Sequence, residues 1–468
     1  MSSQEHLPFV TTGSYPTRGG NSTRLLIDGE PAFRRICEAT ETAQHSVWVT
    51  VTFMWPGFQM PDGRGSALEV LERAAKRGVD VRVIFWRPDD ETATLRRNAF
   101  WGAPEHFNVL RKLEEQISIR WDRAHPGFCQ HQKTWLIDTG EDTQIAFVGG
   151  INLNPHSMVA PGHGYTKNHS EGQNHDVYVE LWGPSVADVH HNFVQRWNEA
   201  SERHTDDGCW GERGNNDLPF PTQLPMERGS AAVQIQRTTH HGRYRHRRAA
   251  VNGPAFDIVS GEQANFDQYL LAVKSARRTI YMENQYVEVL EIVEGLHEAL
   301  EHGVEVVLLM PAAPDISPSA YESPERSAFF EARSALGKYN NFTLAGIAGL
   351  SADGCRKPVY VHSKLMLIDD AWATVGSANL HRFSMFGNGE LNAAIFSPDS
   401  VRAFRVALFE EHLGLDTSGL DDLAALRRFR QIAQANRERL LAGHHDWQGL
   451  AFSLDVSTYG RASQLSLA

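Results

Sequence analysis

Two short stretches of the chain carry histidine, lysine and aspartate at one identical spacing, which can be written H-x-K-x4-D. The six residues are His131, Lys133, Asp138, His362, Lys364 and Asp369. An imidazole with an ordinary pKa of about 6.5 can serve as a nucleophile or as a general acid or base at neutral pH. A lysine supplies positive charge and N–H donors to an anion. The pattern therefore indicates chemistry on an anionic group such as a phosphate.

A turn rich in small residues follows each stretch and ends in an asparagine. The turns span 149–152 and 376–379, and their last residues are Asn152 and Asn379. Glycine lets the backbone approach a small ligand closely, and the asparagine amide adds hydrogen-bond donors. If the two copies pair symmetrically, we expect one pocket with two histidines, two lysines and two asparagines around a phosphate. One imidazole would then attack phosphorus while the other protonates the leaving oxygen.

Strands are expected to position these side chains. Apolar runs at 135–137 and 365–368 follow the two lysines and are typical of buried strands. Because successive side chains of a strand point to opposite faces, we expect the histidine and the lysine of each motif to project on the same face.

The motifs belong to a longer duplication with a period of about 230 residues. Matching strand-like segments lie at 47–53 and 279–286, 78–86 and 302–310, 117–121 and 342–347, 131–138 and 362–369, and 147–154 and 374–381. Stretches with helical periodicity precede the first two strands of each half, at 30–44, 67–78, 262–278 and 291–303. Helices that alternate with Val-, Ile- and Leu-rich strands predict an α/β fold. We therefore expect two similar α/β halves packed about a pseudo-two-fold axis, with the site between them.

A segment rich in Gly, Pro, Asn and Asp separates the two halves. We place the first half at residues 1–205, a linker at 206–230 and the second half at 231–468. Each half then contains one complete H-x-K-x4-D motif.

The paired motifs, each with its small-residue turn and asparagine, resemble the HKD motifs of the phospholipase D superfamily. The resemblance extends over roughly residues 20–440, and the segments 175–197 and 280–287 are similar to phospholipases D proper. It implies two phospholipase D-like α/β sandwich halves, a covalent phosphohistidine intermediate, and no metal or other cofactor. It favours His131 as the nucleophile and His362 as the general acid, although a symmetric site leaves the exchange of these roles open. The groups that would hold the phosphate oxygens are Lys133, Lys364, Asn152 and Asn379.

The resemblance also implies that an acidic residue beyond each motif orients a histidine. Asp176 and Glu390 stand at the matching places. The motif aspartates, Asp138 and Asp369, are more often structural in the family, so we expect them to pair with backbone or basic groups away from phosphorus.

The leading functional prediction is a phospholipase D that hydrolyses glycerophospholipids such as phosphatidylcholine to phosphatidic acid, with transphosphatidylation to an alcohol as a related activity. A nuclease or other non-lipid phosphodiesterase is the first alternative, and the net charge of −12 argues mildly against it. A cardiolipin-synthase-like phosphatidyltransferase is the second. It is less favoured because those enzymes usually carry membrane helices, whereas no apolar run here approaches the ~18 residues that span a bilayer.

No signal-peptide pattern is present and the cysteines are scattered, so we expect a cytoplasmic monomer that contacts a membrane or micelle surface peripherally. Its partners would be a phospholipid and water or an alcohol, with nucleic acid unfavoured. The loops 53–63 and 155–174 are expected to form the acyl-chain or headgroup entrance, with Trp55, Phe58 and Met158 among its residues. The remaining loop histidines are interpreted as polar surface residues rather than metal ligands, and they include His156, His163, His169, His240 and His241.

Overall fold

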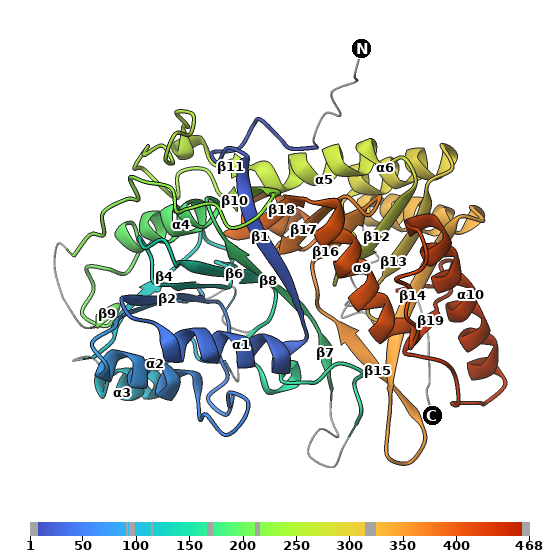
Figure 1. Cartoon of the computed structure of the whole chain (residues 1–468), viewed down its shortest axis with the longest axis horizontal. Coiled ribbons are helices and arrows are strands. Elements are labelled where there is room, and N and C mark those ends of the chain that lie inside the picture. Colours follow the sequence, from blue (N-terminus) through green and yellow to red (C-terminus); the bar gives the residue numbers. More distant parts are fainter. Residues whose placement is uncertain are drawn as a thin grey trace.

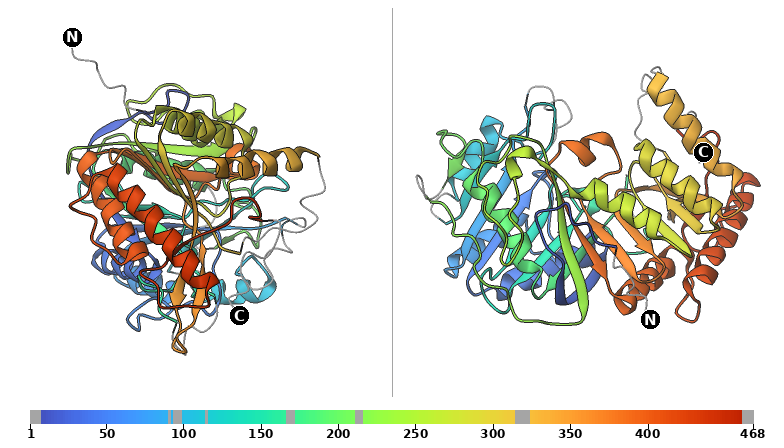
Figure 2. Two further views of the ribbon diagram at one scale, coloured as in Figure 1. Left: turned by 90° about the vertical axis from the view of Figure 1, so that its right-hand side faces the viewer. Right: turned by 90° about the horizontal axis from the view of Figure 1, so that it is seen from above.

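The computed structural model of the chain describes residues 8–89, 92, 99–113, 116–165, 172–210, 216–313 and 324–460. Its strands and helices gather into two α/β lobes that lie side by side, as Figures 1 and 2 show. The first lobe contains the elements up to β9, and the second contains those from β10 onward.

The first half is a mixed sheet with helices on both faces. Its strands run in the order β1–β8–β6–β5–β2–β3–β4–β9, and β2, β3 and β4 are parallel. The strands are β1 (Arg18–Ile27), β2 (Ser46–Val51), β3 (Asp80–Trp86), β4 (Ser118–Asp122), β5 (Thr134–Ile137), β6 (Ile145–Gly149), β7 (Asn174–His175), β8 (Val177–Trp182) and β9 (Cys209–Trp210). The helices are α1 (Gly29–Thr42), α2 (Ala67–Lys76), α3 (Pro104–Arg111), α4 (Val186–Asn198) and the short 3-10 helix η2 (Pro155–Ser157).

The second half repeats this arrangement. Its strands run in the order β11–β10–β18–β17–β16–β12–β13–β14, with β15 and β19 both paired to β14. The strands are β10 (Ala231–Thr239), β11 (Glu262–Gln263), β12 (Thr279–Glu283), β13 (Glu305–Leu309), β14 (Phe342–Leu350), β15 (Arg356–Val361), β16 (Leu365–Ile368), β17 (Trp372–Gly376), β18 (Glu390–Phe396) and β19 (Ala451–Ser453). The helices are α5 (Ala264–Ser275), α6 (Leu290–Glu301), α7 (Pro324–Ala335), α8 (Arg382–Phe386), α9 (Pro398–Leu413), α10 (Asp422–Leu441), and the 3-10 turns η3 (Ile258–Ser260) and η5 (Leu336–Lys338).

Helices cover the two faces of each sheet because the strands are apolar on both sides. In the first half α1 and α2 pack on one face through Phe33, Ile36 and Leu71. On the other face α4 places Phe193 and Trp197 against the strands. The second half matches this pattern, with α5 and α6 on one face and α9 and α10 on the other. The predicted duplicated α/β fold is therefore confirmed.

One hydrophobic core joins the halves. It contains Leu136 and Val179 from the first sheet together with Leu365 and Leu367 from the second, all buried. Strand β1 adds a backbone connection, since its first residues pair with β10 while Ser22 onward pairs with β8. A two-residue parallel pairing of β7 with β15 forms a second crossing. These contacts bring the matching ends of β5 and β16 to a shared interface.

The expectation that the motif histidine and lysine lie within a strand is wrong. Strand β5 begins at Thr134 and β16 begins at Leu365, in each case one residue after the lysine. The reason is a change of backbone partner. The N–H of His131 donates to the carbonyl of Gly389 at 2.7 Å, and that of His362 donates to the carbonyl of His175 at 2.8 Å. Each motif thus leaves its own sheet and pairs with the other half.

Candidate active site

Both motif histidines line one pocket of about 390 Å³ at the interface between the halves. The first half contributes Phe53, Trp86, Thr92, Gly127, Phe128, Cys129 and His131, and the second contributes Gln285, Tyr286, His362, Asn379, His381, Phe383 and Asn388. The walls are largely aromatic, while the polar groups cluster around the two imidazoles. The predicted convergence of His131 and His362 on a shared cavity agrees with this geometry.

Each histidine is paired with a carboxylate that belongs to the other half. Nδ1 of His131 lies 3.0 Å from Oε2 of Glu390, the first residue of β18. Nδ1 of His362 lies 2.6 Å from Oδ2 of Asp176, which stands between β7 and β8. A carboxylate at Nδ1 holds the proton there and leaves Nε2 with its lone pair. The sequence indicated both acids but not this exchange of partners.

The two carboxylates are supported differently. Glu390 accepts hydrogen bonds from the hydroxyls of Ser377 at 2.6 Å and Ser384 at 2.5 Å, and from the amide of Asn388 at 3.3 Å. Burial acts to raise the pKa of Glu390, but the adjacent His131, the charge of Lys133 and the Ser377 hydroxyl outweigh it, so that this pKa stays below its ordinary value.

Asp176 is also buried but accepts fewer hydrogen bonds than Glu390. Its Oδ1 accepts the backbone N–H of Val177 at 2.8 Å, and Gly150 lies so close that a Cβ at this position would collide with the same oxygen. This close approach requires glycine at the second position of the first turn. At the matching position of the second half stands Ser377, whose hydroxyl donates to Glu390.

The two lysines lie buried beside the histidines. Nζ of Lys133 donates to the carbonyl of His131 at 2.7 Å, and Nζ of Lys364 donates to the carbonyl of His362. Burial lowers the pKa of Lys133 to about 7 and that of Lys364 to about 8. An anion bound between them would stabilise the protonated ammonium groups and raise both pKa values.

Burial also changes the histidines. It lowers the pKa of His131 to about 3 and that of His362 to about 4, and the neighbouring lysines act in the same direction. The expectation that both imidazoles titrate near the ordinary value is therefore wrong for the ligand-free chain, where both are neutral at pH 7. A general acid at this site has to gain its proton as the anion binds, because the anion stabilises the imidazolium.

The two asparagines are not equivalent. Asn379 lines the pocket, whereas Asn152 is buried behind its rim and is not among the lining residues. The Oδ1 atom of each has no hydrogen-bond partner among the described residues. The side-chain amide of each asparagine can therefore make a hydrogen bond that the described residues do not use.

The motif aspartates lie beyond the strands, away from the pocket. Asp138 accepts the backbone N–H groups of Gln44, His45 and Ser46, and Asp369 accepts those of Arg277, Arg278 and Thr279. Both aspartates have a positive φ, 52° and 54°, so each forms a tight turn at its strand end. Neither aspartate lines the pocket. Through its hydrogen bonds to backbone N–H groups, each one fixes the end of the strand that follows its motif lysine.

Two of the three residues expected at the acyl-chain or headgroup entrance, Phe58 and Met158, lie elsewhere. Phe58 is 1% exposed and packs its ring against Phe33 in the core of the first half. Met158 packs against that same core, and only Trp55 lies near the pocket, beside Phe53. Residues 166–171 of the loop, with His169, lie outside the described residues. Among the described residues of the expected loops only Phe53 lines the pocket, and the other apolar walls include Phe128, Tyr286 and Phe383, which the sequence patterns did not indicate.

One loop histidine was also misjudged. His156 and His241 are exposed, as expected of polar loop residues. His163 is 1% exposed and lies in a cluster of titratable side chains at the interface of the halves. The sequence around His163 does not indicate this burial, because the side chains that surround it, Asp28, His175 and Glu411, come from other parts of the chain.

No helix among the described residues is both long and apolar enough to cross a bilayer. Among curated proteins, the chain is 26% identical over 407 residues to cardiolipin synthase 1 of Staphylococcus epidermidis, which covers 84% of this chain and 68% of the relative. It is 24% identical over 560 aligned residues to phospholipase D alpha 2 of Oryza sativa subsp. japonica, which covers 88% of this chain and 66% of the relative.

A solved structure of phosphatidylserine synthase from Haemophilus influenzae matches 90% of this chain and 94% of its own, with a TM-score of 0.53 and 12% identity. At that identity the likeness concerns the fold. Residues 36–197 and 269–412 match the family described as "Cardiolipin synthase, PLD-like domain", and together they cover both motifs and both orienting acids. The chain belongs to this family of phospholipase D-like domains.

Proposed function

We propose that this protein is a phosphatidyltransferase that passes the phosphatidyl group of a glycerophospholipid to an alcohol, as a cardiolipin synthase does. The observation that carries the proposal is the pair of crossed contacts, His131 with Glu390 and His362 with Asp176, which aim both imidazoles at one pocket. Each contact leaves an unprotonated Nε2 for chemistry on phosphorus. Lys133 and Lys364 are buried outside the residues that line this pocket, and each contacts the carbonyl of its motif histidine.

In the first step Nε2 of His131 attacks the phosphorus of the bound phospholipid. A P–N bond forms, the P–O bond to the leaving alcohol breaks, and His362 gives its proton to that oxygen. The proton on His362 is the one acquired when the anionic diester binds. Lys133 and Lys364 neutralise the charge that develops on the phosphoryl oxygens, with the amide of Asn379 as a further donor. Asn152 would act from behind the rim.

In the second step His362 takes the proton of the acceptor hydroxyl. The acceptor oxygen attacks phosphorus, the P–N bond breaks, and His131 is released as a neutral imidazole. Water can replace the alcohol in this step, and the products are then phosphatidic acid and the free enzyme. Transfer and hydrolysis therefore share one intermediate, and the acceptor that reaches the pocket decides between them.

Transfer is favoured over hydrolysis by two considerations. The matched family and the Staphylococcus relative are described as cardiolipin synthases. Part of the pocket wall is aromatic, and Phe128 and Tyr286 offer an apolar surface against which an alcohol acceptor could pack. Hydrolysis is the second candidate, and the similarity to the phospholipase D of Oryza sativa along most of the chain supports it.

The test is a product assay with three substrates. Phosphatidylglycerol vesicles should yield cardiolipin and glycerol, phosphatidylcholine with ethanol should yield phosphatidylethanol, and single-stranded DNA should remain intact. His131→Ala and His362→Ala should both abolish the lipid products, while the exposed control His156→Ala should retain them. Release of phosphatidic acid alone, without transfer at any alcohol concentration, would favour the phospholipase D reading. Cleavage of DNA without lipid turnover would reject both lipid activities.

A further inference from the structure

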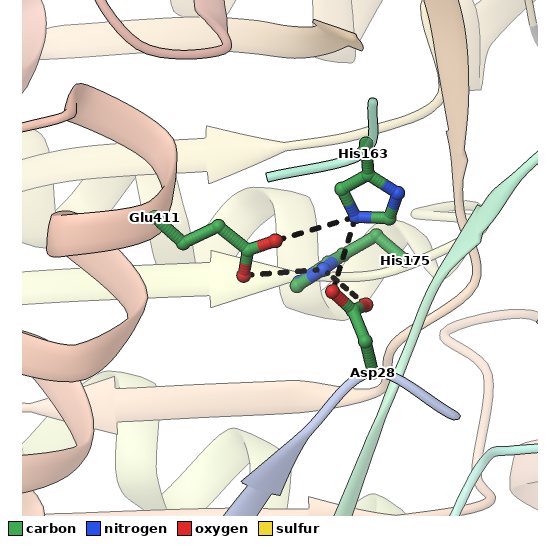
Figure 3. Close-up of side chains that lie close together, drawn as sticks. All are labelled: Asp28, His163, His175 and Glu411. Atoms are coloured by element: carbon green, nitrogen blue, oxygen red, sulfur yellow. Dashed lines mark hydrogen bonds and ion pairs between the residues drawn. The ribbon is translucent and has the colours of Figure 1, made fainter. Parts of the chain in front are cut away.

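A second set of polar side chains is buried between the halves, outside the pocket. It consists of Asp28 after β1, His163 in the loop that follows β6, His175 in β7, and Glu411 in α9, as Figure 3 shows. The side chains of the first three are 0% exposed, and that of Glu411 is 4% exposed. Charged groups are rarely buried so completely unless something compensates them.

The distances within the cluster suit a small cation. Nε2 of His163 lies 3.3 Å from Oδ2 of Asp28 and 3.4 Å from Oε1 of Glu411. Nδ1 of His175 lies 3.0 Å from Oδ1 of Asp28 and 3.8 Å from Oε2 of Glu411. A tetrahedral zinc ion with N and O ligands at about 2.0–2.2 Å separates its ligand atoms by about 3.3–3.6 Å. The distances from the two histidines involve both oxygens of each carboxylate, and a set with one ligand atom from each side chain lies within 4.8 Å of one another. Small side-chain shifts would close this set to such a geometry.

The outer nitrogens of the two histidines are occupied by acceptors. Nδ1 of His163 lies 3.1 Å from Oε1 of Gln173, whose amide nitrogen donates to the carbonyl of Gly164, so that this oxygen must accept. Nε2 of His175 lies 3.0 Å from Oε2 of Glu283. These contacts can hold a proton on each outer nitrogen, which would leave the inner nitrogens free to bind an ion. This is the support that metal-binding histidines characteristically have. Without an ion, Nδ1 of His175 makes a hydrogen bond with Oδ1 of Asp28 at 3.0 Å.

Glu283 is a strong acceptor at that position. Its carboxylate also accepts hydrogen bonds from the hydroxyls of Tyr281 and Ser363, each at 2.6 Å, and lies 3.1 Å from Nε2 of His412. With so many donors around it, Glu283 stays ionised and holds the proton of His175 on the outer side. Inside the cluster, Nε2 of His163 and Oδ2 of Asp28 make no hydrogen bond of acceptable geometry.

We propose that Asp28, His163, His175 and Glu411 form a structural site for a divalent transition-metal ion, zinc above all. Two neutral imidazoles and two carboxylates balance the charge of the ion and can fill a tetrahedral shell, which would leave no open position for water. Magnesium and calcium are less suited, because they prefer shells made of oxygen alone. The ion takes no part in the phosphoryl chemistry, which lies on the other side of the His175 backbone.

The site would position the second motif. The carbonyl of His175 accepts the backbone N–H groups of His362 and Ser363 at 2.8 and 3.1 Å, and Asp176, the next residue, orients the imidazole of His362. Asp28 donates its own backbone N–H to the carbonyl of Asp176 at 2.8 Å. Because Glu411 belongs to the second half and the other three ligands to the first, the ion would also tie the halves together.

The experiment measures metal in the full chain, purified without chelator and without a polyhistidine tag. Elemental analysis should find one zinc per chain, and the cobalt-substituted protein should show the intense visible absorption of four-coordinate Co²⁺. His163→Gln and Glu411→Gln should lose the metal. The control His156→Gln changes an exposed histidine of the same loop and should keep a full equivalent.

The alternative is a network held by protons, with both imidazoles charged. It predicts a wild-type chain without zinc, no thermal stabilisation when zinc is added, and a cobalt spectrum like that of the aqueous ion. Any of these results would overturn the proposal, as would a full equivalent of zinc in His163→Gln. The wild-type measurements decide the question even if the variants do not fold. They are also independent of whether the pocket transfers phosphatidyl groups.

Discussion

The two motif sites place the same pair of groups in different surroundings. At the first, His131 meets Glu390, whose carboxylate is held by Ser377, Ser384 and other donors of the second half. At the second, His362 meets Asp176, which receives one backbone N–H and has Gly150 packed against it. Duplication preserved the histidine–carboxylate pair but not its support. The crossed arrangement also means that neither half contains a complete site.

The largest effect is expected from the histidines themselves, and it separates their roles. His131→Ala should lower phosphatidyl transfer by about 10⁴-fold or more, because it removes the nucleophile. His362→Ala should cost about 10²–10⁴-fold, the usual contribution of a general acid. Initial rates on phosphatidylglycerol vesicles give both values.

A diester with a p-nitrophenol leaving group sharpens this comparison, since that group departs without protonation. His362→Asn should then accumulate a covalent phosphoryl adduct at residue 131, detectable by intact-protein mass spectrometry. The adduct should be missing in His131→Asn. An adduct that forms at residue 362 instead would reverse the assignment of nucleophile and acid.

The orienting acids are expected to come next. Asp176→Asn should reduce kcat by about 10²–10⁴-fold, because an amide at Nδ1 favours the wrong imidazole tautomer. Glu390→Gln should cost less, since the surrounding hydroxyls can rotate and hold the amide oxygen toward His131. Steady-state kinetics of the two variants test the difference. Equal losses would show that the donors around Glu390 contribute nothing to the orientation of the histidine.

An exchange of the turn residues should have smaller and unequal effects. Gly150→Ser inserts a side chain where a Cβ already collides with Asp176, so it should displace that carboxylate and lower activity by about 10²-fold, the loss expected when a catalytic group moves by an ångström. Ser377→Gly removes one hydrogen bond of Glu390, which is worth about 1–3 kcal/mol and so at most about 5- to 150-fold in rate. Because Ser384 and Asn388 still donate to the same carboxylate, we expect a loss of about tenfold. Circular dichroism should confirm that both variants fold. A milder effect from Gly150→Ser would contradict the steric argument.

Local patterns were sufficient to predict much of this molecule. The repeated strands and both motifs are visible in the sequence because each depends on residues close together in the chain, whereas Asp176 and Glu390 were indicated only by the family resemblance. The exchange of partners was not visible, since it depends on Gly389 pairing with the backbone of His131 across the interface. The lowered histidine pKa values depend on burial that only the packed halves produce. The cluster around His163 joins four distant segments, none of which has a motif of its own.

The lysines are tested by binding rather than by turnover, through the pH dependence of anion affinity. The charged ammonium binds the anion, and each lysine loses its proton as pH rises through its pKa, about 7 for Lys133 and about 8 for Lys364. The affinity for dimethyl phosphate, whose own charge is constant over this range, should therefore be highest at pH 6. It should weaken by up to about tenfold per pH unit for each lysine that must regain its proton to bind. Proton uptake by His362 adds a decline common to all variants. Beyond it, Lys133→Met should retain the further fall that begins near pH 8, and Lys364→Met the one that begins near pH 7, as measured by calorimetric titration. A wild-type affinity that does not change between pH 6 and 9 would mean that both ammonium groups stay charged throughout. Burial would then not lower the two lysine pKa values by different amounts.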